Sequence, residues 1–148
     1  MSRLALPLLP VAAPVRLAVA ASGTLLLVGM LLGIWKWRQM LRAPSHAAHP
    51  YVDIAHRAAL LYAFACLVLA ALVAASPLPA AVNLAAVAGP IAFFVSAVVT
   101  YARLGMAART ENQFEARTFT TTTGMWLLAV AEVGGAAVAL AGFLMGTA

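Results

Sequence analysis

One uncharged run of 45 residues, from Ala58 to Ala102, constrains this chain more than any other feature. A helix crosses the roughly 30 Å of hydrocarbon in a bilayer with about 20 residues, so the run is too long for a single crossing. The sequence Ser76-Pro77-Leu78-Pro79 near its middle is typical of a turn. The run therefore predicts two transmembrane helices joined by a tight loop.

Two further apolar stretches flank this run. Leu17 to Trp35 is uncharged, and Thr118 to Ala148 carries Glu132 as its only charge. Of the whole chain, 65% is hydrophobic and 9% charged, whereas a soluble domain has about 25% charged residues. The apolar residues do not alternate with polar ones at period two, as they do in a membrane β-barrel. We therefore expect an all-α integral membrane protein that forms one domain over 1–148. Residues 1–14 should form an irregular segment. The rest should form an antiparallel bundle of four transmembrane helices, over about 15–38, 51–75, 80–105 and 118–146.

The basic residues predict how this bundle is oriented. Seven of the nine lie around the first and third connections between helices, and cytoplasmic loops are rich in Lys and Arg. We expect a multi-pass protein of the cell (inner) membrane, with both termini outside and loops 1 and 3 in the cytoplasm. Four aromatic residues fall at the same predicted boundary, where amphipathic rings are common. The seven basic residues are Lys36, Arg38, Arg42, Arg57, Arg103, Arg109 and Arg117, and the four aromatic residues are Trp35, Trp37, Tyr51 and Tyr101.

All three histidines lie close together around the start of the second predicted helix. His46, His49, Asp53 and His56 have spacings of three, four and three, which place them within about 80° of one another on a continuous helix. His and Asp are ligands for divalent metals, so a metal- or cofactor-dependent membrane enzyme is one hypothesis. Pro50 favours the alternative, in which two histidines lie in a loop and Asp53 lies in the first turn of a helix.

Polar side chains concentrate between the third and fourth predicted helices. They provide either a solvated loop whose threonines cap the fourth helix, or a docking surface for an anion or a partner protein. The residues concerned are Arg109, Glu111, Asn112, Gln113, Glu115 and Arg117.

Glu132 is the one acidic residue predicted inside the membrane. Its position in the fourth helix places it near the bilayer midplane, where an ionised side chain costs about 2.5–3.5 kcal/mol. Tyr62 and Ser96 are expected at a similar depth and could donate hydrogen bonds to it. Three roles stay open for Glu132: a protonated acid that locks the bundle, a pairing group for another subunit, or a proton or cation carrier.

Small residues at four-residue spacing let helices approach closely in lipid. Gly29 with Gly33, Gly135 with Ala139, and Gly142 with Gly146 form such pairs. We expect them to pack inside the bundle, with a subunit interface as the alternative.

Together these features favour a non-catalytic accessory, assembly or binding subunit of a larger membrane complex, with a polar cytoplasmic face for docking. The alternatives are the metal-dependent enzyme and a small proton-coupled transporter that uses Glu132. The expected partners are the lipid bilayer and either further copies of the chain or a larger complex. The net charge of +5 is interpreted as a topology signal, so no nucleic acid is expected. A divalent metal and lipid are the two candidate ligands.

Overall fold

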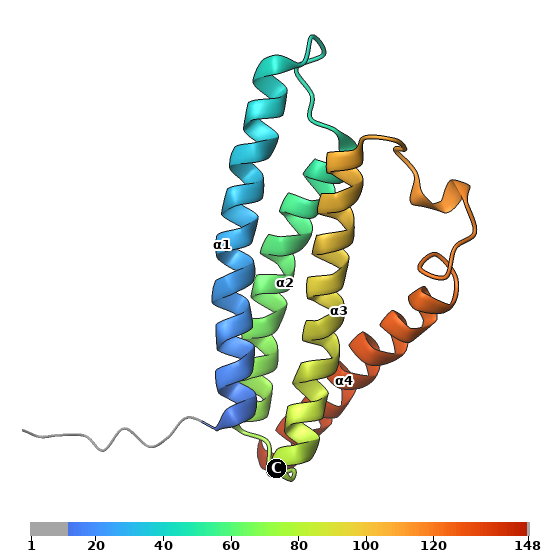
Figure 1. Ribbon diagram of the computed structural model, residues 1–148. Coiled ribbons are helices and arrows are strands. Elements are labelled where there is room, and N and C mark those ends of the chain that lie inside the picture. The colour runs from blue at the N-terminus through green and yellow to red at the C-terminus, as the bar shows by residue number, and fades with distance from the viewer. Residues whose placement is uncertain (1–11, 148) are drawn as a thin grey trace, which may run out of the picture.

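The computed structural model describes residues 12–147, which form four long helices and one short one (Figure 1). No strand occurs in this part of the chain, and each long helix is long and apolar enough to cross a membrane. The predicted fold, an all-α antiparallel bundle of four helices able to span a membrane, is therefore confirmed. The helices are α1 (Ala13–Arg42), α2 (Pro50–Ala74), α3 (Ala80–Ala107), the 3₁₀ helix η1 (Gln113–Glu115) and α4 (Thr123–Thr147).

The helix ends follow the prediction except at α1 and α4. α1 begins at Ala13 and continues to Arg42, and residues 1–11 of the expected N-terminal segment lie outside the described residues. α4 begins five residues later than expected, because the preceding threonines bond to the backbone of their own segment. The Thr121 hydroxyl donates to the Ala116 carbonyl at 3.1 Å, and the Thr122 hydroxyl donates to the Thr118 carbonyl at 2.7 Å. Such local bonds compete with helix formation.

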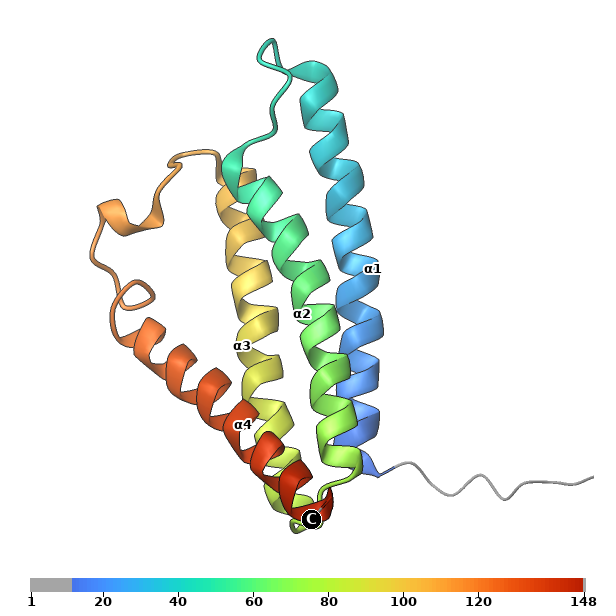
Figure 2. The same cartoon turned by 180° about the vertical axis from the view of Figure 1, so that it is seen from behind.

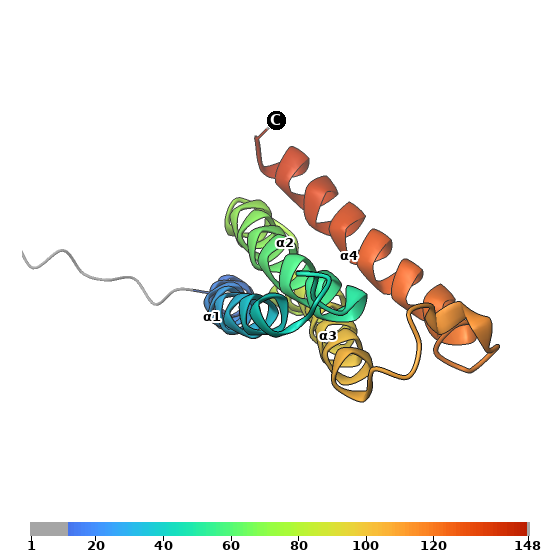
Figure 3. The ribbon, with the colours of Figure 1, turned by 90° about the horizontal axis from the view of Figure 1, so that it is seen from above.

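α1, α2 and α3 pack side by side, whereas α4 crosses them obliquely (Figures 1 to 3). α2 contacts all three other long helices. The α1–α2 and α3–α4 connections lie at one end of the bundle, which we call the charged end (Figure 1). The charged end carries the seven basic residues named above together with Asp53, Glu111 and Glu115.

Small side chains allow α1 and α2 to approach closely. A Cβ atom at Gly29 would lie 2.7 Å from the Leu60 side chain, and one at Gly33 would lie 2.9 Å from the His56 ring. Ser22 is buried and its hydroxyl donates to the Ala63 carbonyl of α2 at 2.8 Å. Packing of the Gly29 and Gly33 pair inside the bundle is therefore confirmed.

α4 is attached to the bundle through its C-terminal half. A Cβ atom at Gly135 would lie 2.6 Å from both the Ala86 carbonyl oxygen and the Pro90 ring, and Ala139 is fully buried. Gly142 and Gly146 lie against the α2–α3 connection, so these small residues also pack inside the chain. The N-terminal half of α4 diverges from α3 (Figure 2), and its Trp126, Val130 and Val133 side chains are 70–76% exposed.

Candidate functional site

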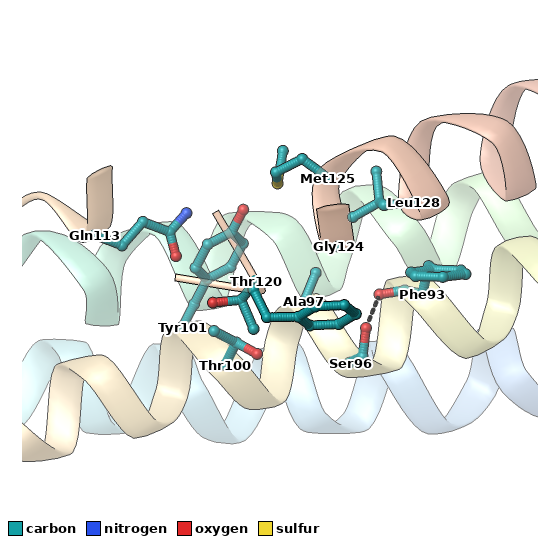
Figure 4. Close-up of a pocket in the computed structure, with 11 residues that line it drawn as sticks. Phe93, Ser96, Ala97, Thr100, Tyr101, Gln113, Thr120, Gly124, Met125 and Leu128 are labelled. Atoms are coloured by element: carbon teal, nitrogen blue, oxygen red, sulfur yellow. Dashed lines mark hydrogen bonds between the residues drawn. The ribbon is translucent and has the colours of Figure 1, made fainter. Parts of the chain in front are cut away.

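The divergence of α4 from α3 opens a cleft near the charged end (Figure 4). The cleft has a volume of about 180 Å³. A closed apolar cavity of about 150 Å³ is large enough to hold benzene, so the cleft is the size of a small ring. Its lining residues are Phe93, Ser96, Ala97, Thr100, Tyr101, Gln113, Phe119, Thr120, Gly124, Met125 and Leu128.

The lining of this cleft combines aromatic rings with uncharged hydrogen-bonding groups. Gln113 and Tyr101 lie at one end of it, and Phe93 and Leu128 lie toward the other (Figure 4). The Ser96 hydroxyl donates to the Phe93 carbonyl at 2.9 Å. None of the eleven lining residues is charged, so the cleft offers groups that bind and orient a neutral molecule.

Tyr51 holds the polar end of the cleft in place. This residue is buried in the first turn of α2, and its hydroxyl oxygen accepts a 2.5 Å hydrogen bond from the Gln113 backbone N–H. The Tyr51 ring also stacks on Tyr101 of α3, with ring centroids 6.1 Å apart. One side chain thus connects α2, α3 and η1. Sequence reasoning identified Tyr51 and Tyr101 only as membrane-boundary aromatics, because their partners are distant in the chain.

Glu132 lies one helical turn beyond Leu128, deeper in the bundle. Its Oε1 atom is buried and has no hydrogen-bond partner among the described residues. No hydrogen bond joins Glu132 to either predicted partner: Ser96 bonds to its own helix, and the Tyr62 ring stacks on Phe94 with centroids 4.2 Å apart.

The structure places the four predicted metal ligands in separate environments. His46 is exposed in the α1–α2 connection, and His49 caps α2, with its Nδ1 accepting a hydrogen bond from the Tyr51 N–H at 3.3 Å. Because α2 begins at Pro50, both histidines precede the helix that would have aligned them with Asp53 and His56.

The other two predicted ligands bond to neighbouring groups. The Asp53 carboxylate forms salt bridges with Lys36 at 2.5 Å and with Arg57 at 2.9 Å. The His56 Nδ1 atom lies 2.8 Å from the Gly29 carbonyl oxygen of α1. Within residues 12–147 no group of three or more His, Cys, Asp or Glu side chains is arranged to hold a metal ion. The structure therefore does not bring the predicted ligand set together.

The polar connection between α3 and α4 keeps most of its side chains at the surface. Arg109, Glu111 and Arg117 are exposed, and across residues 12–147 the two salt bridges both involve Asp53. Glu115 accepts a 2.9 Å hydrogen bond from Thr110, and the Asn112 side chain caps η1. The charges of this segment are thus available to a partner.

Comparison with models of protein families, with curated proteins and with solved structures finds no match to this chain.

Proposed function

We propose that this chain is a non-catalytic integral membrane subunit that receives one transmembrane helix of a larger membrane complex. The helix would lie in a second hollow between α3 and α4, which we call the small-residue groove. The groove is open and almost wholly apolar, and most of its lining side chains are small. It is lined by Ala81, Val82, Ala85, Ala86, Gly89, Val130, Ala131, Gly134, Gly135 and Val138.

Two glycines in this groove carry the proposal. A Cβ atom at Gly134 would meet nothing within 4 Å, and one at Gly89 would meet only Ala131, at 3.9 Å. The packing of the chain itself therefore does not require glycine at either position, although glycine disfavours a helix by about 0.8–1 kcal/mol relative to alanine. Close approach of a second helix in lipid does favour such residues.

The charged end favours a different protein over a second copy as the partner. Its seven basic and three acidic side chains give a net charge of +4. Copies inserted with one orientation would place two such ends side by side, where like charges repel. A partner with acidic loops complements this end, and the exposed Arg109 and Arg117 of the α3–α4 connection are available to it. In this proposal the charged end is cytoplasmic and the membrane is the cell (inner) membrane.

Affinity purification from the native membrane in mild detergent tests the proposal. We expect the wild-type chain to retain one partner protein in a fixed ratio, and a Gly134→Leu variant to lose it because the added side chain fills the groove. Gly23→Leu is the matched control, because Gly23 lies on α1 and a Cβ atom there also meets nothing within 4 Å. A cooperative thermal unfolding transition in both variants, at a temperature no lower than that of the wild type, would show that the fold is intact.

Three results would contradict this proposal. A monodisperse monomer without a partner would refute it. A stable complex of the chain with itself alone would refute the choice of a different protein. Equal loss of the partner in the Gly23→Leu and Gly134→Leu variants would refute the groove as the docking site.

A second candidate function is proton transfer through Glu132, supported by its buried Oε1 atom without a partner. The test uses liposomes that contain the purified chain and a pH-sensitive dye. Glu132→Gln preserves the shape of the side chain and removes its titration. Proton flux that is unaltered in this variant would refute the carrier role.

A further inference from the structure

We infer that the cleft between α3 and α4 binds a neutral ring head group with carbonyl acceptors, of the benzoquinone type, whose alkyl tail lies in the membrane. This inference does not depend on the partner proposed above, because the cleft and the small-residue groove are two separate hollows that share no lining residue.

The size and walls of the cleft suit a planar ring. Its volume of about 180 Å³ slightly exceeds that of a protein cavity that binds benzene. Phe93, Tyr101 and Phe119 supply three aromatic rings, and aromatic side chains bind flat ligands by stacking and edge contacts. Apolar walls with a few polar groups are typical of small-molecule sites.

Free hydrogen-bond donors are available for carbonyl oxygens. The Thr100 and Tyr101 hydroxyls and the Gln113 side-chain amide all line the cleft, and none of them takes part in a side-chain hydrogen bond within residues 12–147. By contrast, the Ser96 and Thr120 hydroxyls are already bonded to neighbours. A ligand with two acceptors would therefore find donors that the chain itself leaves unused.

The absence of charge in the lining indicates a neutral ligand. A charged head group would lose its hydration in the cleft without gaining a counter-charge, which is unfavourable. The polar end of the cleft faces the charged end of the bundle, and Phe93 and Leu128 lie deeper (Figure 4). A ring whose polar edge lies at Gln113 would direct its alkyl tail past Leu128 into the apolar region.

Equilibrium binding of a radiolabelled decyl-benzoquinone to the purified chain in lipid nanodiscs tests this inference. We expect saturable binding at one site per chain, above the partitioning into empty nanodiscs. Tyr101→Phe and Gln113→Leu should each weaken binding about fivefold, the effect of losing one hydrogen bond. Ser96→Phe should abolish saturable binding by filling the cleft, since Ser96 lines it and is exposed.

Tyr62→Phe is the matched control, because Tyr62 does not line the cleft. Its affinity should equal that of the wild type, and thermal unfolding of every variant should show an intact fold. Binding that never saturates, or saturable binding that survives Ser96→Phe, would overturn the inference. So would equal weakening by Tyr62→Phe and Tyr101→Phe, or displacement of the probe by a tetraalkylammonium ion as readily as by unlabelled quinone.

Discussion

Two adjacent glycines of α4 should respond to alanine with opposite changes in stability. Gly135 faces α3, and its added Cβ atom would lie 2.6 Å from the Ala86 carbonyl oxygen and from the Pro90 ring, where ordinary contact begins at 3.4 Å. Neither a backbone oxygen nor a proline ring can rotate away. α4 would therefore have to move away from α3 by about 0.8 Å, the difference between 2.6 Å and 3.4 Å. At Gly134, by contrast, the added atom meets nothing within 4 Å.

The magnitudes follow from these contacts. Overpacking against immobile atoms costs about 2–3 kcal/mol, and the helix preference of alanine offsets about 1 kcal/mol of this. We therefore expect Gly135→Ala to lower the free energy of unfolding by about 1–2 kcal/mol. Gly134→Ala should raise it by about 0.4–1 kcal/mol, because alanine lowers the entropy of the unfolded chain without a steric penalty.

The assay uses Cys66, the single cysteine of the chain, whose side chain is fully buried in α2. A thiol-reactive fluorescent dye reports its exposure as each variant is unfolded with increasing SDS in mild detergent. The midpoint should fall for Gly135→Ala and rise for Gly134→Ala. Shifts of the same sign and size in both variants would refute the arrangement of α4 against α3.

Three further predictions concern contacts between helices. Ser22→Ala should lower the free energy of unfolding by about 0.6 kcal/mol, the mean value for a hydrogen bond between membrane helices. Thr24→Ala is the control and should leave this free energy unchanged, because Thr24 bonds only to its own helix. Equal effects of the two substitutions in the thiol assay would contradict this prediction. Asp53→Asn should lower the free energy of unfolding by up to about 1 kcal/mol, because the ion pairs of Asp53 are partly exposed. A loss above about 3 kcal/mol in the same assay would contradict the description of these ion pairs as partly exposed. Tyr51→Phe should accelerate hydrogen exchange of the Gln113 amide by removing its acceptor, and exchange that stays as slow as in the wild type would show that this bond does not form.

The four helices could be predicted because their cause is local. Long uncharged stretches and the Ser76-Pro77-Leu78-Pro79 turn are visible in the sequence, and the structure confirms the helices they predict. The glycine spacing also predicted internal packing correctly. The start of α4 was predicted five residues too early, since composition alone does not reveal that threonine hydroxyls will bond to the backbone before the helix.

The candidate site was harder to predict because it depends on tertiary contacts. The cleft exists only because α4 diverges from α3, and Gln113 is held there by Tyr51, 62 residues earlier in the chain. The histidine spacing suggested a ligand set, yet a proline starts α2 between His49 and Asp53 and the two histidines before it lie outside the helix. Sequence spacing describes one face of a helix only where that helix is continuous.

The one-sided attachment of α4 gives the chain a mechanical property. The contacts at Gly135, Gly142 and Gly146 hold the C-terminal half in place, and the helix start at Thr123 lies about 18 Å from Gly135 at 1.5 Å per residue. A tilt of about 6° around Gly135 would displace the far end by about 2 Å, roughly the difference between an open and a closed contact for a side chain. The tilt of α4 therefore determines the width of the cleft, and a molecule or helix that lies beside α4 would change that width.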